Sequence, residues 1–310
     1  MADFRPGSPE QAAFLDALTA RGLLIASGVP GVYGRSGEFE RIRWGVDRLI
    51  TRNAAGDEPE HMAFPPLLPR RELESIGYLT NFPHLAGSVF AFAGSEEDAA
   101  AQEQRASCHE DWSEFQSMTD LVLTPAACYP VYPAVAARGP LPRGGITVDA
   151  GGSYVFRHEP SGDPARLQMF HQREIVRLGE PDTVAAWRDE WRDRAVALLR
   201  SIGVDARFDV ASDPFFGRAG RMLARSQREQ ALKFEVLTDI AGPEPTAVAS
   251  FNYHHDHFSS TYSIEMEGEE PAHTACLGFG LERITLALLH QHGLDTAAWP
   301  TAVREELALG

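Results

Sequence analysis

Apolar residues recur every three or four positions in several segments of the chain, the spacing that places them on one face of a helix, and the segment 96–116 is acidic and rich in alanine. The best patterned segment is 182–203, where Asp182 is the expected N-cap and Gly203 the expected end. Another segment begins with Ser8 and Pro9, a typical helix start. We therefore expect helices over 8–28, 38–53, 96–116, 182–203, 214–232 and 279–292.

Shorter apolar or alternating runs separate these segments in the second half of the chain. They predict strands over 120–124, 146–149, 154–159, 167–177, 234–239, 247–253, 261–267 and 272–277. Most are joined by short turns, which favour antiparallel pairing because parallel neighbours need long crossovers. The sequence thus predicts an α+β fold, a mostly antiparallel sheet flanked by helices, in a single domain over 1–310.

The composition narrows the class of protein. The chain has 310 residues, of which 44% are hydrophobic and 23% charged, as in a folded globular protein. No apolar run approaches the ~20 residues that span a bilayer, and the N-terminal MADFRPGSPEQ does not resemble a secretory leader. The three cysteines, Cys108, Cys128 and Cys276, are odd in number and widely spaced. These features predict a cytoplasmic protein with no membrane partner.

The formal net charge of −16 opposes binding along a nucleic-acid backbone, which usually requires a basic surface. One segment of the chain has the opposite charge. Its arginines step by three, four and three residues, so they line one face of the helix expected over 214–232: Arg218, Arg221, Arg225 and Arg228. This stripe is either a solvated face or a docking surface for an acidic partner.

The segment 154–177 concentrates the residue types that an ATP site uses. Guanidinium forks suit phosphate, an aromatic ring suits adenine, and a carboxylate accepts a hydrogen bond from the adenine amino group. Residues two apart on a strand share a face. The residues concerned are Arg157, Glu159, Arg166, Phe170 and Glu174, with Gln168 and Gln172 between the last three. The plain alternative is the salt-bridged solvent face of a hairpin.

A second motif, HTACLGFGLERITLALL over 273–289, has the pattern of a strand, a glycine turn and a helix. Arg283 falls in the first turn of that helix. Helix N-termini offer free N–H groups and a positive dipole, so an arginine there adds to an anion site. Taken alone, the motif also fits an ordinary turn with a surface arginine.

Together the two motifs resemble motifs two and three of the class II aminoacyl-tRNA synthetases, and Pro66 in FPPLLP would be the proline of motif one. The resemblance spans 38–292 and is greatest for the seryl-type core. Cys128, in LTPAAC, stands where that core has a glutamate. With this cysteine and with ASFNYHHDHF at 249–258, the sequence resembles the zinc-dependent atypical seryl-tRNA synthetases. It also resembles their truncated relatives, the amino acid:[carrier protein] ligases. No separate tRNA-binding domain is expected.

The resemblance implies roles for particular residues. Arg157 and Arg283 would be catalytic. ATP would be bound by Arg157, Glu159, Arg166, Leu167, Phe170, Lys233, Ala247, Val248, Ala249, Ser250 and Arg283. The zinc ligands would be Cys128, Glu174 and Cys276, and the substrate amino acid would contact Gln172, Glu174 and Asn252. Ala247 replaces a magnesium-binding glutamate of the seryl pattern, so Glu235 is the expected ligand for the Mg²⁺ that accompanies ATP.

The zinc prediction depends on the resemblance. Cysteine and glutamate are acceptable zinc ligands, and three protein ligands with an open position are typical of catalytic zinc. Without the resemblance, two buried free cysteines would be the better interpretation. Cys108 lies outside the motifs and is expected to be structural. In the cluster from His254 to His257 only His255 and His257 would share a strand face, so we expect the cluster at the rim of the site.

These implications add up to an ATP-dependent ligase. It would convert a small amino acid, glycine or alanine, to an aminoacyl-adenylate and pass it to the phosphopantetheine thiol of an acidic carrier protein, docked on the arginine stripe. Motif one implies a homodimer through 38–66. The runner-up is a shortened seryl-type synthetase that charges tRNA. The non-enzymatic alternative is a regulatory paralogue that binds ATP or an amino acid.

Overall fold

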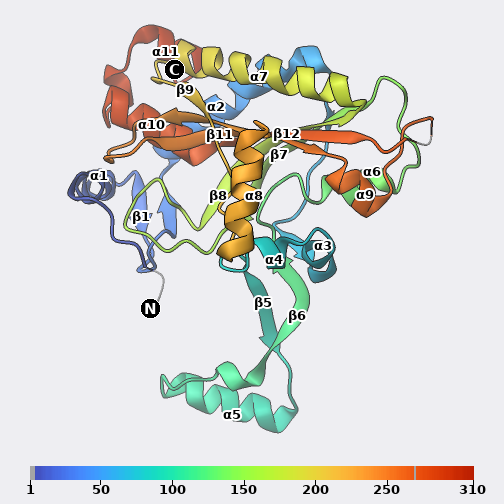
Figure 1. Cartoon of the computed structure of the whole chain (residues 1–310). Coiled ribbons are helices and arrows are strands. Elements are labelled where there is room, and N and C mark those ends of the chain that lie inside the picture. Colours follow the sequence, from blue (N-terminus) through green and yellow to red (C-terminus); the bar gives the residue numbers. More distant parts are fainter. Residues whose placement is uncertain (1–3, 269) are drawn as a thin grey trace.

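The computed structural model describes residues 4–268 and 270–310, and a seven-stranded sheet forms its centre (Figure 1). In spatial order the strands are β3 (Glu60–His61), β7 (Ile146–Phe156), β8 (Met169–Gly179), β12 (His273–Gly280), β11 (Thr246–His255), β10 (Lys233–Thr238) and β9 (Arg207–Val210). Neighbouring strands are antiparallel except β3 and β7, which are parallel. The predicted α+β class with a mostly antiparallel sheet is confirmed.

Helices pack on both faces of this sheet and form two hydrophobic cores. Their bounds are α1 (Pro9–Ala20), α2 (Gly37–Ala54), α3 (Arg70–Ser75), α4 (Tyr78–Asn81), α5 (Glu96–Ser107), α6 (Val131–Ala136), α7 (Pro181–Ser201), α8 (Gly217–Glu229), α9 (His257–Tyr262), α10 (Leu281–His292) and α11 (Thr301–Glu306). One core contains residues of α2, α7 and α10, and the other contains residues of α3, α4, α6 and α9. Among the described residues no helix is both long and apolar enough to span a bilayer.

Two smaller sheets stand apart from the central one. The first pairs β1 (Leu24–Ala26) with β2 (Tyr33–Arg35). The second has the order β4 (Leu67–Pro69), β6 (Gln116–Leu123) and β5 (Ser88–Phe92). Figure 1 shows β5 and β6 as a ribbon that carries α5 away from the central sheet.

The first helix is shorter than its expected range of 8–28. The capping box at Ser8 forms as predicted, but the helix ends at Ala20. Gly22 adopts a φ of +71°, and the N–H of Leu23 donates to the carbonyl of Leu18 at 2.9 Å. This closure is the usual glycine-terminated helix end, and it leaves the next residues to form β1.

Two other helix ends differ from expectation. The helix expected over 96–116 ends at Ser107, and β6 begins at Gln116. In α7 the N-cap is Glu180 rather than Asp182, because Pro181 occupies the first helical position and supplies no N–H. The expected stop at Gly203 is confirmed by its φ of +78° just beyond the helix.

Two strand predictions were wrong. The runs 146–149 and 154–159 form one strand, β7, which ends at Phe156, so Arg157 and Glu159 follow the strand instead of sharing its face. The run 261–267 is not a strand, and α9 covers its start. Phe258 of α9 stacks on Tyr132 with ring centroids 3.9 Å apart. This packing overrides the β-favouring residues of the run.

Candidate active site

A cavity of about 470 Å³ lies on one face of the central sheet and gathers most of the predicted site residues. Strand alternation explains why one face is polar. Phe170, Gln172 and Glu174 of β8 line the cavity, whereas Ile175 is in the core on the opposite face. Gly278 of β12 pairs with Glu174. A Cβ at Gly278 would come within 3.1 Å of the Glu174 carboxylate, so glycine keeps this face open.

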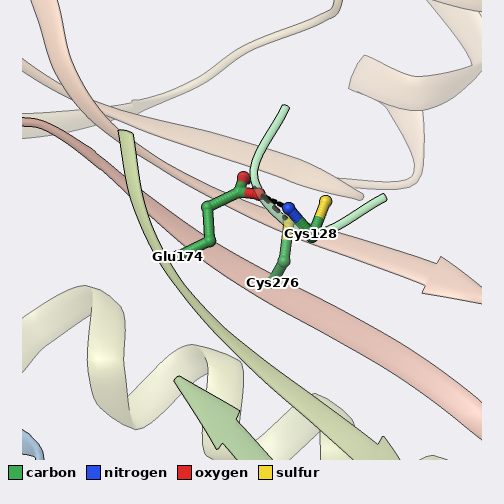
Figure 2. A group of neighbouring side chains, drawn as sticks. All are labelled: Cys128, Glu174 and Cys276. Atoms are coloured by element: carbon green, nitrogen blue, oxygen red, sulfur yellow. Dashed lines mark hydrogen bonds between the residues drawn. The ribbon is translucent and has the colours of Figure 1, made fainter. Parts of the chain in front are cut away.

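Three potential metal ligands that line this cavity converge on one another (Figure 2). Cys128 comes from the turn before α6, Glu174 from β8 and Cys276 from β12, and all three are buried. Their ligand atoms all lie within 4.8 Å of one another. Cys276 Sγ is 3.8 Å from Glu174 Oε1, and the backbone N–H of Cys128 donates to Glu174 Oε2.

This donor set suits a zinc ion. Two ligands ~2.0–2.3 Å from a tetrahedral zinc lie roughly 3.3–3.8 Å apart, and the distance of 3.8 Å between Cys276 Sγ and Glu174 Oε1 falls at the upper end of that range. Burial raises the pKa of the Cys128 thiol and of the Glu174 carboxyl, so these groups lack the solvation that would stabilise their charged forms. A bound cation would supply that stabilisation, and two sulfurs with one oxygen favour zinc over magnesium.

His254 belongs to this cluster, so the prediction that 254–257 form a rim feature was wrong for it. His254 Nε2 lies 3.6 Å from Cys276 Sγ, and Asn252 Nδ2 lies 3.5 Å from the same sulfur. Burial lowers the pKa of His254 to about 3, with His257 adding to the effect, so its ring is neutral. His255 and the exposed His257 also line the cavity, but they do not share a strand face as predicted, because β11 ends at His255 and His257 begins α9.

Arg157 and Phe170 stand together on the cavity wall. The Arg157 guanidinium carbon lies 5.6 Å from the centroid of the Phe170 ring. Arg157 Nε donates to the carbonyl of Pro125 at 3.1 Å, which orients the group from the turn that also carries Cys128. The arrangement presents a fixed positive charge beside an aromatic face, as binding of a nucleotide requires.

Arg283 also lines the cavity, but backbone groups hold much of it. Its Nε donates to the carbonyl of Ala165 at 2.7 Å and one terminal nitrogen donates to that of Ala247 at 2.9 Å. Burial and nearby arginines lower its pKa. Two further ATP candidates, Glu159 and Arg166, pair with each other at 2.8 Å and are not among the lining residues.

Most of the remaining residues predicted to bind ATP line the cavity, and one does not. Lys233 and the run Ala247, Val248, Ala249 and Ser250 line the cavity, whereas Leu167 is buried outside it. Lys233 Nζ lies 2.6 Å from Asp213 and 3.0 Å from Glu235. These carboxylates raise the pKa of Lys233 against the effect of burial. An ammonium group therefore already sits beside Glu235, the residue that we predicted to bind magnesium.

Helix α8 has two distinct sides. The four arginines of the predicted stripe, Arg218, Arg221, Arg225 and Arg228, are all exposed. Leu223, Ser226 and Gln227 line the cavity. Gln227 Nε2 donates to Asp213 Oδ2 at 2.8 Å, which ties the helix to the ion pair of Lys233. The other cysteine, Cys108, is exposed at the end of α5.

Sequence reasoning missed an aromatic wall of the cavity. Tyr78 and Phe82 come from α4 and the residue that follows it, and Phe215 precedes α8. Phe82 and Phe215 stack with centroids 5.1 Å apart. Asp213 was missed as well. These residues lie in short segments without alternation or helical period, so no sequence pattern marked them.

Fold and site together define a class II aminoacyl-tRNA synthetase-like catalytic core. The structure superposes on M. kandleri SerRS, in its crystal complex with A. aeolicus tRNASec, with a TM-score of 0.79 and 19% identity over 100% of this chain and 62% of that protein. Seryl-tRNA synthetase from Pyrococcus horikoshii, complexed with ATP, gives a TM-score of 0.68 at 14% identity over 99% of this chain and 69% of that one.

Sequence comparison defines the family within this class. Amino acid–[acyl-carrier-protein] ligases 1 and 2 of Bradyrhizobium diazoefficiens are each 46% identical to the chain, over 97% of its length and 92% and 90% of theirs. The chain belongs to the amino acid–[acyl-carrier-protein] ligase family and is a ligase. The type-2 serine–tRNA ligase of Methanopyrus kandleri is 24% identical over 87% of the chain and 54% of that relative. No protein-family model matches the chain.

Proposed function

We propose that the chain activates a small amino acid with ATP and passes it to a carrier protein as a thioester. In the first step a carboxylate oxygen of the amino acid attacks the α-phosphorus of ATP, and pyrophosphate leaves. In the second step the phosphopantetheine sulfur attacks the carbonyl carbon of the adenylate. AMP leaves, and the thiol proton passes to solvent or phosphate.

One observation carries this proposal: a buried Cys128–Glu174–Cys276 cluster shares a cavity with Arg157. A metal cluster alone would fit a structural site, and an arginine with an aromatic ring would fit any nucleotide site. The presence of both in one cavity supports a site that holds an amino acid and ATP side by side. Family membership favours a carrier protein over tRNA as the acceptor, and an enzyme over a regulatory paralogue.

Zn²⁺ is the proposed resident ion, held by Cys128, Glu174 and Cys276. When bound, it would supply a Lewis-acidic position for the free amino group of the substrate. Oδ1 of Asn252 is buried with no hydrogen-bond partner among the described residues, which supports the proposed role of this residue toward the same amino group. Gln172 lies two residues from Glu174 on the same strand and completes the proposed amino acid contacts.

The protein's own groups would stabilise the charge that develops during activation. Arg157 is proposed to meet the α-phosphate, because among the described residues its guanidinium has one hydrogen-bond partner, the backbone carbonyl of Pro125. Arg283 is proposed to bind the phosphate chain, and Phe170 to bind the adenine ring. Such preoriented donors stabilise a transition state without reorganising. Mg²⁺ would accompany ATP, with Glu235 as the proposed ligand.

Glycine or alanine is the proposed substrate. Tyr129 and Phe258 line the cavity near Cys128, and Phe258 stacks on Tyr132. We infer that these rings narrow the space open to a larger substrate side chain. The exposed arginines of α8 support docking of an acidic carrier, since opposite charges steer association.

The proposal includes a homodimer and a cytoplasmic location. Trp44 of α2 is exposed although it is a large apolar residue, which supports a covered face on the 38–66 segment and a homodimer. Light scattering that shows a stable monomer would contradict this. The three cysteines are free, which suits the reducing cytoplasm as the proposed location.

The experiment that tests the function is incubation of the full chain with ATP, Mg²⁺ and single amino acids. Amino acid-dependent exchange of pyrophosphate into ATP reports activation, and intact-protein mass spectrometry reports the acceptor. We expect exchange with glycine or alanine and one added aminoacyl group on a holo-carrier protein, but none on the carrier without phosphopantetheine. Strongest exchange with a bulky amino acid, or charging of tRNA instead of the carrier, would contradict the proposal.

A further inference from the structure

Strand β11 departs from regular pairing where it passes Cys276. Asn252 pairs with Cys276 and Tyr253 with Ala275, but the next residue of β12, Thr274, pairs with His255. His254 is therefore the extra residue of a β-bulge. His255 takes a φ of +52°, which few non-glycine residues adopt. Bulges re-aim side chains and are frequent beside active sites.

The bulge keeps His254 pointing toward the same sulfur as Asn252. Both ring nitrogens of His254 have partners: Nε2 lies 3.6 Å from Cys276 Sγ, and Nδ1 lies 3.0 Å from the hydroxyl oxygen of Thr274. Thr274 is fully buried, so its hydroxyl is held in place. The Cys276 sulfur therefore faces two side-chain nitrogens of β11, His254 Nε2 and Asn252 Nδ2.

Metal binding at Cys276 would decide which ring nitrogen of His254 donates a hydrogen bond and which accepts one. A sulfur bound to a metal is a thiolate and has no proton to donate. Nε2 must then carry the ring proton and donate it to the sulfur, and Nδ1 must accept from the hydroxyl of Thr274. Residues that orient a ligand in this way set its donor strength toward the metal.

We propose that His254, held by Thr274, is a positioning residue that donates a hydrogen bond to the Cys276 thiolate and orients that thiolate toward the metal. The inference rests on the metal site of the proposed function. It assigns to His254 a role that is distinct from metal ligation, because its ring does not join the group of three mutually close ligand atoms.

The test uses the full chain, stripped of metal and titrated with Co²⁺, whose absorption reports both the coordination geometry and the sulfur-to-metal charge transfer. The variants are His254→Gln, Thr274→Val and, as the matched control, His257→Gln, since His257 is exposed and no hydrogen bond among the described residues joins its ring to a ligand. We expect every protein to bind one Co²⁺ with unchanged tetrahedral bands. His254→Gln should bind Co²⁺ about 10–100-fold more weakly and shift the charge-transfer band.

Thr274→Val should shift that band in the same direction by a smaller amount, and it changes only one buried hydroxyl if His254→Gln folds poorly. The control should match wild type. A charge-transfer band that stays unchanged in both variants would overturn the inference. Loss of the tetrahedral bands in His254→Gln would identify His254 as a ligand and overturn it too. Failure of wild type to bind Co²⁺ would instead refute the metal site itself.

Discussion

The two faces of the central sheet bury side chains of opposite chemistry. On one face Ile175, Leu277 and Phe279 join the core that contains residues of α2, α7 and α10. On the other face Glu174 and Cys276, from the same two strands, meet in the cavity. Successive side chains of a strand point to opposite faces, so one alternating sequence builds a core and a site at once.

The difference lies in what burial does to the free energy of folding. Each large apolar side chain stabilises the fold by ~1.5–3 kcal/mol when it leaves water. A buried polar atom destabilises it unless a partner satisfies its hydrogen bonds. On the cavity side, the hydroxyl of Tyr78 and Oδ1 of Asn252 are buried without a partner among the described residues. Hydrogen bonds among the described residues do not satisfy these two groups, whereas a polar ligand in the cavity would.

The largest expected effect tests the apolar face. Phe279 is fully buried and its ring lies edge-on to Trp191 and Phe251. Phe279→Ala should lower the free energy of unfolding by about 3–5 kcal/mol, because it leaves a cavity in the core. Urea unfolding measures this. Phe90→Ala, at a position that is 58% exposed, is the control and should stay within ~0.5 kcal/mol of wild type. Equal effects at the two positions would contradict the comparison.

On the polar face, Arg157→Ala should affect catalysis and leave stability nearly unchanged. Its guanidinium is half-buried and has one backbone partner, so little of the fold depends on it. Loss of a donor to a developing phosphate charge costs about 10²–10³ in rate in comparable sites. Pyrophosphate exchange measures the loss, and Arg143→Ala, an exposed arginine outside the site, is the control. Near-normal exchange in Arg157→Ala would mean that the site is misplaced.

Asp213→Asn, on the polar face, should lower the free energy of unfolding by an amount that depends on pH. Burial acts to raise the pKa of Asp213, but Lys233 and Gln227 outweigh it and lower the pKa below the unfolded value. The contribution of Asp213 is therefore complete above pH ~4 and is lost as the pH falls through the folded pKa. At pH 7 we expect a loss of about 2–3 kcal/mol in unfolding free energy.

That loss should shrink in acid, as urea unfolding of wild type and variant across pH 3–7 would show. A difference between the two proteins that is constant across this range would contradict the ion pair with Lys233. Gln227→Ala keeps the ion pair and removes only the hydrogen bonds to Asp213, so it should have the smaller effect.

The smallest effect concerns the exposed side of α8. Arg221→Glu combined with Arg225→Glu should leave pyrophosphate exchange intact and slow thioester formation on an acidic carrier roughly tenfold at low salt. Added salt should slow wild-type transfer as well, because screening weakens the attraction. Arg143→Glu, a single charge reversal at an exposed arginine outside the stripe, is the control for the loss of one positive charge elsewhere on the surface. Equal transfer by the double variant and wild type would leave the stripe as a solvated face.

Much of this arrangement could be predicted from sequence. Alternation in 170–174 correctly placed Phe170, Gln172 and Glu174 on one face, and the resemblance led to Cys128 as a partner for Cys276, 148 positions along the chain. Alternation also puts His254 on the face of Asn252, two residues earlier, so the prediction that placed His254 at the rim missed a contact that the spacing allows. The expected strand at 261–267 does not form, since its first two residues end α9, which packs against Tyr132.

What sequence patterns do not encode is contact between irregular segments. Asp213 lies 20 residues before Lys233, on a loop with no periodic pattern, yet the pair forms one wall of the cavity. Tyr78 reaches the same cavity from a four-residue helix. Both are placed by tertiary packing, which no local propensity or spacing describes.

The central claim is that the polar face is built around a metal that Cys128, Glu174 and Cys276 hold together. Elemental analysis of the purified full chain tests it most directly, with wild type, Cys276→Ser and Cys108→Ser compared in parallel. The account predicts about one zinc per chain in wild type and in Cys108→Ser, whose cysteine is exposed far from the cluster, and a large loss in Cys276→Ser. No zinc in wild type, or full occupancy in Cys276→Ser, would contradict it.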